Sequence, residues 1–306
     1  EKYGATKAAT DAAEAFNDPS VTAVNVCLLN DQHAPVTIAA LKAGKHVMCE
    51  KPIAMAIEDV LAMQAESKKQ KKELIIGVVN RYNSYVNLVK DTIASGELGT
   101  VYHVSFSFKS FRGIPGLGGW FTTKKHAGGG VMADWGIHFL DLTLYALGLP
   151  EPTSVSGVAH SELARDMKGY AFVNMWAGPP KFDGVYDVEE FVSGVVRTKG
   201  PSIAFEGAWA HNIDKPAMHI DFLGTKAGLR LEYRKGFTMY GTENGHLFEK
   251  TPHIKEENDF HAEMKAFIDS AVDGKPNRAH IDNVVVSQRI IDAFYKSAAQ
   301  GKEIVL

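Results

Sequence analysis

The N-terminal part of this chain alternates short, nearly continuous apolar runs with segments of helical periodicity, and this alternation constrains the fold more than any other feature. The apolar runs have the length of strands and occupy residues 23–29, 46–49 and 74–79. Runs without polar alternation are typical of strands that are covered on both faces of a parallel sheet. Short connections between strand and helix require right-handed crossovers. The pattern therefore predicts a doubly wound parallel α/β domain.

Capping residues, proline and glycine mark the helices of this domain. Asp11 is expected to cap a short helix that ends at Phe16, and Pro35 lies near the first turn of a helix that Gly44 terminates. A further helix is expected over residues 57–71.

The tripeptide Glu50-Lys51-Pro52 directly follows the second apolar run. It therefore lies at the carboxyl end of a strand, the edge where open α/β sheets bind ligands. Pro52 fixes its own φ and excludes Lys51 from the helical region, so the backbone aims the lysine side chain. We interpret Lys51 as a functional residue. The alternative is an exposed pair of Glu50 and Lys51 at a strand end.

A second polar pattern follows the glycine triplet at residues 128–130. On a helix that continues to residue 147, Asp134, His138, Asp141 and Tyr145 form one polar stripe. The rest of this helix is apolar nearly all round, which predicts that it is buried. The stripe must then face a cavity, or leave unpaired polar groups at a cost on the order of several kcal/mol. The alternative is that His138 is a core histidine bonded to Asp134.

Together these motifs resemble the Gfo/Idh/MocA family of nicotinamide-dependent sugar and polyol oxidoreductases over essentially the whole chain. The family places asparagine and histidine after one strand, Glu-Lys-Pro after the next, asparagine after the third, and Asp, Gly, His and Asp beyond a glycine triplet. The matching residues are Asn30, His33, Glu50, Lys51, Pro52, Asn80, Asp134, Gly136, His138 and Asp141. Where members usually carry Thr-Pro before the first asparagine, this chain has Leu28-Leu29.

The resemblance implies hydride transfer between the nicotinamide of NAD or NADP and a secondary hydroxyl of a sugar, cyclitol or polyol. Lys51, Asp134 and His138 are then the catalytic residues. His138 is the base, and Lys51 stabilises charge on the reacting oxygen. Asp134 is expected to fix the tautomer of His138 or to hold a neighbouring hydroxyl, and Glu50 to pair with Lys51.

The same resemblance assigns the ligand contacts. The residues expected to bind the cofactor are Asn30, His33, Glu50, Lys51, Pro52 and Asn80. The substrate is expected to contact the catalytic residues and also Arg112 and Trp120, which lie in a long loop at residues 110–127. An indole face suits the apolar face of a sugar ring, and a guanidinium suits hydroxyl oxygens. The alternative is that this loop is a flexible surface segment.

One part of the family pattern is absent, because the sequence contains no Gly-x-Gly-x-x-Gly between a strand and a helix. The family's strand order, 3-2-1-4-5-6, would place one strand near residues 5–8 and leave the run at 23–29 as an apolar edge. Exposed edges favour aggregation, so we expect a longer protein, or another chain, to fill this gap. The residues that select NAD or NADP belong to the absent segment.

The remaining sequence predicts a second domain with a different organisation. We assign residues 1–82 to an incomplete Rossmann-type domain and residues 83–306 to an α+β domain. Runs of strand length occur at 101–109, 153–160, 188–197, 203–210, 218–224, 228–232 and 237–240, and helices are expected at 256–272 and 283–300. Several runs alternate apolar with polar residues, as in an antiparallel sheet with one covered face. We expect a second subunit to cover the open face, in a homodimer or homotetramer.

Composition excludes several classes of function. The net charge is -3, with 45% hydrophobic and 23% charged residues, so no basic surface for nucleic acid or an anionic membrane is expected. No apolar run approaches the roughly twenty residues of a membrane helix, and a cytoplasmic protein is expected. Cys27 and Cys49 are interpreted as buried core residues. No metal site is expected, because His253, His261 and Glu263 are interpreted as surface and packing residues.

Two alternatives to a dehydrogenase stay open at this point. One is an NAD-dependent glycosidase, which oxidises its substrate transiently with the same residues. The other is a binding or regulatory protein on the same scaffold. Retention of Lys51, Asp134 and His138 favours an enzyme.

Overall fold

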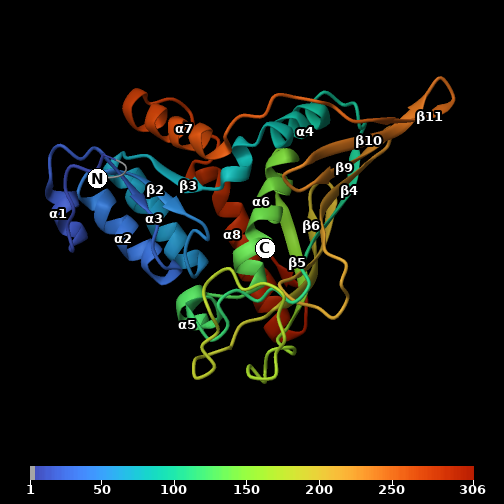
Figure 1. Cartoon of the computed structure of the whole chain (residues 1–306). Helices are drawn as coiled ribbons and strands as arrows, with labels where there is room; N and C mark the ends of the chain where they lie inside the picture. Colours follow the sequence, from blue (N-terminus) through green and yellow to red (C-terminus); the bar gives the residue numbers. More distant parts are fainter. Residues whose placement is uncertain (1–3) are drawn as a thin grey trace.

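The computed structural model describes residues 4–306, which build two sheets side by side (Figure 1). The smaller sheet contains β1 (Ala23–Val26), β2 (His46–Glu50) and β3 (Leu74–Gly77) in that spatial order. All neighbours are parallel, with Val26 opposite Cys49 and Cys49 opposite Ile76. The predicted parallel α/β domain is therefore confirmed, although the first and third strands are shorter than the apolar runs that predicted them.

Helices α1 (Ala12–Asn17), α2 (Asn30–Lys42) and α3 (Ile57–Gln70) connect this sheet. Asp11 caps α1 as predicted, its carboxylate accepting a hydrogen bond from the backbone N–H of Ala13. Helix α2 begins at Asn30, five residues before Pro35, so Asn30 lies at the start of this helix. The prediction of a strand near residues 5–8 is wrong, because residues 4–9 have no regular structure.

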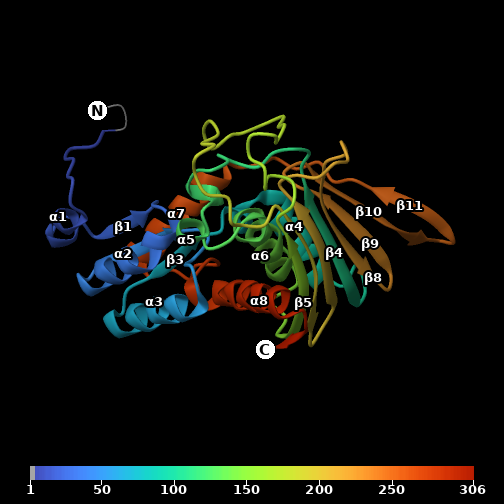
Figure 2. The ribbon, with the colours of Figure 1, turned by 90° about the horizontal axis from the view of Figure 1, so that it is seen from below.

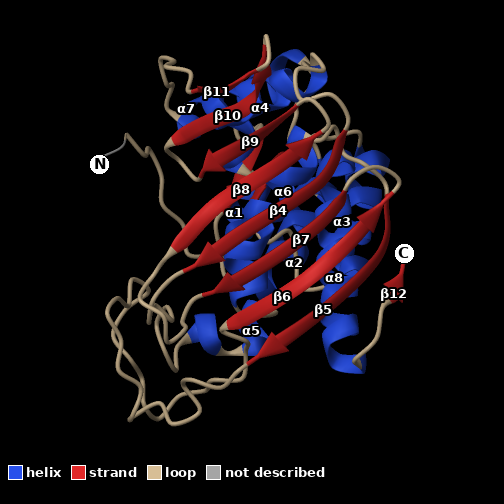
Figure 3. Ribbon diagram, turned by 90° about the vertical axis from the view of Figure 1, so that its right-hand side faces the viewer, coloured by secondary structure: helices blue, strands red, loops and turns tan. Residues whose placement is uncertain are grey.

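The larger sheet forms the second layer of the molecule (Figure 3). Its spatial order is β11-β10-β9-β8-β4-β7-β6-β5-β12. Only β4 and β7 pair in parallel, which confirms the mostly antiparallel sheet. The strands are β4 (Val101–Lys109), β5 (Pro152–His160), β6 (Phe191–Thr198), β7 (Ser202–Ala208), β8 (Ala217–Gly224), β9 (Ala227–Glu232), β10 (Gly236–Glu243), β11 (His246–Lys250) and β12 (Ile304–Val305).

Helices cover one face of the larger sheet and leave the other open (Figures 2 and 3). The covering helices include α4 (Ser84–Ala94), α6 (Ile137–Ala146) and α8 (Ile281–Gln300). Between them and the sheet, the stacked rings of Phe106, Phe108, Phe139 and Phe205 form part of the core. None of the helices in residues 4–306 is long and apolar enough to cross a bilayer.

The C-terminal part of the chain returns to the first domain. Helix α7 (Asp259–Asp273) and the start of α8 contribute Phe267, Ile281 and Val284 to the core around the small sheet. The backbone N–H of Ile76 donates to the carbonyl of Ala279 at 2.9 Å. The division into domains of residues 1–82 and 83–306 stays a prediction. The hydrophobic core of the first domain includes side chains from the second range.

Candidate active site

A cleft lies where the carboxyl ends of β1 and β2 meet the second domain. Its cavity has a volume of about 260 Å³. The first domain contributes Cys27, Leu28, Asn30, Glu50, Lys51 and Pro52, and the second contributes Trp120, Phe121, Ala127, Gly129, Ala133 and Asp134. Lys51 and Asp134, which the sequence analysis selected from separate motifs and which lie 83 residues apart in the sequence, are therefore part of one site.

Lys51 and Asp134 make direct contact across this cleft. The Lys51 ammonium lies 3.0 Å from Oδ1 of Asp134 and also donates to the backbone carbonyl of Asp134 at 3.3 Å. The side chains are 20% and 9% exposed, respectively. The expected pair of Lys51 with Glu50 is wrong: a Glu50 carboxylate oxygen accepts instead from the backbone N–H of Lys51, at 3.2 Å. Glu50 therefore orients the backbone of the lysine while Asp134 holds its ammonium.

Asp134 lies in a π-helical segment, Met132–Gly136, that runs directly into α6. Its second carboxylate oxygen accepts a hydrogen bond from Nε1 of the fully buried Trp209, at 3.1 Å. Both oxygens of Asp134 are thus engaged, and its hydrogen bonds in the structure do not include His138. The sequence analysis predicted a hydrogen bond between Asp134 and His138, either to fix the histidine tautomer in catalysis or to satisfy a core histidine. Both predictions are wrong.

His138 makes its contact with Asn80 instead. The amide nitrogen of Asn80 lies 3.4 Å from Nδ1 of His138, and it also lies 3.2 Å from the hydroxyl of Tyr233. Burial, followed by the positive charges of Lys51 and Arg234, holds the pKa of His138 well below its usual range. The imidazole is therefore neutral near pH 7. His138 does not line the cavity itself, although the Lys51 charge acts on its ring.

The remaining members of the predicted polar stripe do not face the cleft. Asp141 forms a fully buried ion pair with Arg81, with N–O distances of 2.8 and 2.7 Å, and Ser287 donates a third hydrogen bond to it at 2.9 Å. The Tyr145 hydroxyl donates to the side-chain oxygen of Asn87. The single stripe facing one cavity is therefore wrong, because these two residues serve the core behind the site.

The start of the helical segment is held by Glu189, which the sequence analysis missed. This buried carboxylate accepts hydrogen bonds from the backbone N–H groups of Gly130 at 2.9 Å and Met132 at 3.1 Å. The Tyr295 hydroxyl donates to it at 2.9 Å. Burial raises the pKa of Glu189. No spacing signal connects residues 130, 189 and 295, so only the fold reveals this arrangement.

Two residues expected to bind the cofactor also connect parts of the cleft, and their contact with the cofactor stays a prediction. His33 is buried, and its ring nitrogens contact the carbonyl oxygens of Pro52 at 2.7 Å and Leu28 at 3.1 Å. It therefore joins the loops that follow β1 and β2. Asn30 donates from its amide to the carbonyl of Ala127 at 2.9 Å, a contact between the two domains.

The long loop at residues 110–127 contains a short 3₁₀ turn, Trp120–Thr122, and helix α5 (Lys124–Ala127). Trp120 lines the cleft, with its ring against Phe121. Arg112 does not line the cleft. Its guanidinium donates to the side-chain oxygen of Asn212 and lies over the ring of Tyr170.

The two cysteines differ in their surroundings. Cys49 is buried, as predicted, and burial raises its pKa to about 12. Cys27 is exposed and lines the cleft, so its interpretation as a core residue is wrong: β1 ends at Val26, one residue earlier.

Glu263 is buried, and burial together with Glu50 and Asp259 raises its pKa to about 8. Glu263 is therefore a core carboxyl on α7 and not a surface residue.

Comparison with known proteins places this geometry in a family. Residues 86–230 match the model of the GFO/IDH/MocA C-terminal domain, and residues 1–78 match that of the oxidoreductase family with an NAD-binding Rossmann fold. D-glucoside 3-dehydrogenase from Escherichia coli K12 is 31% identical over 310 residues, which cover 100% of this chain and 85% of that protein. The chain belongs to the Gfo/Idh/MocA family of oxidoreductases.

Other members of the family support this assignment. Myo-inositol 2-dehydrogenase from Thermotoga maritima is 32% identical over 148 residues, 48% of this chain and 42% of that protein. The structure of aldose-aldose oxidoreductase from Caulobacter crescentus with glycerol has a TM-score of 0.78 at 25% identity, over 96% of this chain and 82% of that one. Levoglucosan dehydrogenase with NADH and levoglucosan has a TM-score of 0.85 at 20% identity, over 99% and 85% of the two chains, and shows the shared fold.

The cofactor of this oxidoreductase is NAD or NADP, and the cleft has side chains that fit it. The cleft lies at the carboxyl edge of the parallel strands, where the fold binds dinucleotides. Its lining includes Lys51 with hydrogen-bond donors, Glu50 with acceptors, and the apolar side chains of Leu28 and Pro52, a combination that would suit ribose hydroxyls and a flat ring.

Proposed function

We propose that this protein transfers a hydride between the nicotinamide of NAD or NADP and a secondary hydroxyl carbon of a sugar, cyclitol or polyol. The bound cofactor supplies the hydride acceptor or donor. The contact between Lys51 and Asp134 carries the proposal, because it places a cation and a carboxylate from different domains in the cleft. The chain's own residues then bind the alcohol, move its proton and stabilise the charge on its oxygen.

In this proposal His138 moves the proton. Its lowered pKa keeps the imidazole neutral near pH 7, which is the form that accepts a proton during alcohol oxidation. An Nδ1–H bond to the Asn80 amide oxygen would leave the Nε2 lone pair for the substrate, and an amide presents either oxygen or nitrogen depending on its rotation. The Tyr233 hydroxyl lies 3.2 Å from the nitrogen and 3.3 Å from the oxygen of the same amide, and a hydroxyl can pair with either atom. Asn80 thus replaces Asp134 as the residue that positions the base.

Lys51 stabilises the reacting oxygen. An ammonium has three donors, and Asp134 takes two of them, through one carboxylate oxygen and its backbone carbonyl. When the substrate binds, the ammonium can exchange the weaker carbonyl contact for the alcohol oxygen, on which negative charge develops as the proton leaves. The carboxylate of Asp134 is held in turn by Trp209, so the lysine has a fixed partner.

The substrate class rests on the relatives and on the aromatic side chain in the cleft. Relatives are named for a glucoside, myo-inositol and 1,5-anhydro-D-fructose. Trp120 provides an aromatic wall of the cleft, which suits the apolar face of a sugar ring. We propose Trp120 as a substrate contact. Arg112 is no longer part of the proposal, because its guanidinium is directed to Asn212 and Tyr170.

The test is a screen of aldoses, cyclitols, polyols and simple glycosides with NAD⁺ and NADP⁺. A dehydrogenase forms reduced nicotinamide in proportion to product. Release of a leaving group without net reduced nicotinamide would identify a glycosidase and overturn the proposal. Absence of any NAD(H) or NADP(H) binding, measured by cofactor fluorescence, would identify a regulatory protein. The variants Lys51→Met and His138→Asn should lose turnover and retain the fold.

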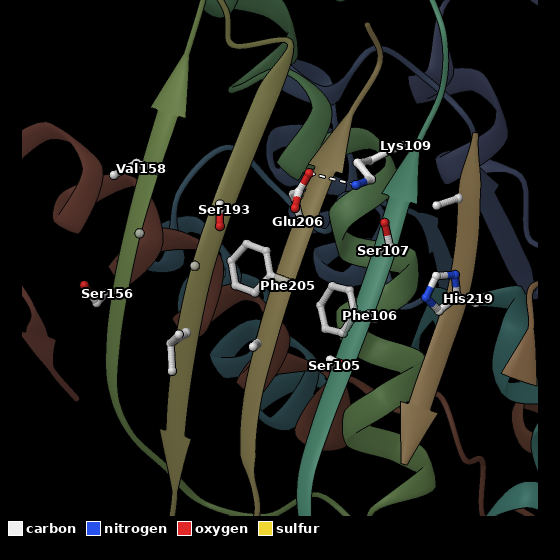
Figure 4. A pocket seen from close by; sticks show the side chains of 15 residues that line it. Ser105, Phe106, Ser107, Lys109, Ser156, Val158, Ser193, Phe205, Glu206 and His219 are labelled. Atoms are coloured by element: carbon white, nitrogen blue, oxygen red, sulfur yellow. Dashed lines mark hydrogen bonds and ion pairs between the residues drawn. The ribbon is translucent and has the colours of Figure 1, made fainter. Parts of the chain in front are cut away.

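We further propose that a second copy of the chain covers the open face of the large sheet, in a homodimer or homotetramer. This face carries mostly small side chains and a shallow hollow (Figure 4). Across the hollow, Lys109 and Glu206 form an ion pair at 2.8 Å, and Val158 and Val195 stay 49% and 38% exposed. Light scattering should give a multiple of the chain mass. A Val195→Lys variant should reduce it, whereas a monomeric parent protein would contradict the proposal.

Because the reaction draws on NAD or NADP, we propose the cytoplasm, which holds these cofactors, as its location. Fractionation of cells should find the activity there, and activity confined to another compartment would refute this assignment.

A further inference from the structure

A second cavity lies behind the active-site helix and shares no residue with the cleft. It has a volume of about 520 Å³ and is bounded by α4, the end of α6 and the segment that leads into α8. Its wall includes Arg81, Lys90, Tyr145, Asn277, Arg278 and Asn283. Three of these six residues are cations, so the charge of the wall decides which ligand it suits.

Arg81 is the one cation of this wall whose charge is balanced. Its guanidinium is paired with the buried Asp141 and donates as well to the backbone carbonyls of Arg278 and Asn283. All three guanidinium nitrogens of Arg81 therefore donate hydrogen bonds within the fold, and Arg81 is a fixed structural element of the cavity wall.

Lys90 and Arg278 are not balanced in this way. The Lys90 ammonium donates to the carbonyl of Tyr145 at 3.1 Å and lies 4.6 Å from the centre of its ring. Arg278 donates to the carbonyl of Arg81 and the side-chain oxygen of Asn87. All of these acceptors are neutral, and neither cation has a carboxylate oxygen within 4.0 Å in residues 4–306.

The electrostatic environment of Lys90 agrees with this surplus of positive charge. Burial and the guanidiniums of Arg81 and Arg278 lower the pKa of Lys90, and the carboxylate of Asp91 offsets this only in part. A ligand with negative charge would relieve the repulsion between these cations.

The wall also holds an unused hydrogen-bond donor. Asn277 is 8% exposed, and its side-chain oxygen accepts from the hydroxyl of Tyr82 at 2.7 Å and from the backbone N–H of Ala279 at 2.8 Å. Its side-chain nitrogen is buried without a hydrogen-bond partner among the described residues. Buried donors are nearly always paired. The cavity wall thus combines an ammonium and a guanidinium that have only neutral acceptors with a residue whose amide nitrogen has no partner among the described residues.

We propose that this cavity binds an oxyanion, the phosphate or carboxylate group of a small metabolite, between Lys90 and Arg278. Charge-assisted hydrogen bonds from lysine and arginine to such oxygens are among the strongest in proteins. The site is separate from the proposed reaction, so its test does not depend on knowing the substrate.

Isothermal titration of the full chain with inorganic phosphate, at constant ionic strength maintained with chloride, tests the proposal. Malonate titrated in the same way distinguishes carboxylate from phosphate. We expect saturable binding of at least one of these anions. Lys90→Gln and Arg278→Gln should each weaken it about tenfold, the loss of one charge-assisted hydrogen bond, and leave the unfolding transition in urea nearly unchanged.

Two controls make the result specific. Lys296→Gln, which removes an exposed lysine elsewhere on α8, should bind the anion as the parent does. Saturating reduced cofactor should not displace the anion from the parent, because the two cavities share no residue. Absence of saturable binding by both anions, or equal affinity in parent, Lys90→Gln and Arg278→Gln, would overturn the proposal. Displacement by the cofactor would also overturn it.

Discussion

Replacement of Lys51 by methionine tests the proposed reaction at its most informative position. The ammonium lies 3.0 Å from the Asp134 carboxylate in the cleft. In the proposed reaction it also stabilises the alcohol oxygen as charge develops there. Removing one such donor in other enzymes costs about 10² to 10³ in kcat, or roughly 2.7–4 kcal/mol of transition-state stabilisation. We expect a fall in kcat of that order in Lys51→Met.

The effect on stability should be smaller. A hydrogen bond to a charged group contributes about 1.5–3 kcal/mol when buried, and the exposed fractions of 20% and 9% reduce this value. Trp209 still donates to Asp134 in the variant. We therefore expect the free energy of unfolding to fall by about 1–2 kcal/mol, measured by urea denaturation, with the folded state retained.

A matched control comes from Lys45, a lysine of the same domain that is 7% exposed and donates to the carbonyl of Asp18 at 2.8 Å. Lys45→Met should lower stability by a similar amount and leave kcat unchanged. Steady-state rates of both variants are measured with the substrate found in the screen. A Lys51→Met enzyme with kcat within about threefold of the parent would refute the role given to Lys51.

Other predictions address the base, the core and the helix start. Burial first, and then neighbouring cations that include Arg234, lower the pKa of His138. The rate of alcohol oxidation should therefore stay at its plateau below pH 6.5. Arg234→Met removes a positive charge and should raise the pKa of His138, which moves the acidic limb of the pH–rate profile to higher pH. An unchanged limb would contradict this. Arg81→Met leaves its buried aspartate partner unpaired and should lower the free energy of unfolding by about 3–5 kcal/mol; a loss below about 1 kcal/mol in urea denaturation would argue against it. A β-carbon at Gly130 would lie 1.9 Å from a backbone carbonyl oxygen, so Gly130→Ala should displace the helix start and reduce kcat. Gly228→Ala, where the nearest atom is 3.6 Å away, should be close to the parent, and equal activity of the two variants would count against the argument.

The elements of the fold could be predicted where local signals were strong. Strand β4 occupies the predicted residues, and α3 and α8 end within a residue of their predicted limits. Apolar periodicity and glycine stops act over a few residues, so they are legible in one sequence. The strand expected at residues 5–8 had no such signal, since it rested on the family's strand order alone, and the structure has none there.

The site could be predicted in its residues but not in its contacts. Lys51 and Asp134 were selected from separate motifs, and the fold brings them together. The partner of Asp134 on its other side, Trp209, comes from the end of a distant strand, and no spacing rule links the two. The π-helical turn at Met132–Gly136 interrupts the regular α-helical spacing on which the predicted stripe rested. Asp141, in the regular helix that follows, pairs with Arg81 in the core.

Direct hydride transfer is the central claim, and a deuterium-labelling experiment tests it most directly. The substrate found in the screen is labelled with deuterium at the carbon that bears the reacting hydroxyl, and the reduced cofactor is analysed by mass spectrometry after turnover. The proposed reaction predicts one deuterium in each reduced nicotinamide formed, and no labelled cofactor with His138→Asn. Product formation with unlabelled reduced cofactor would contradict it.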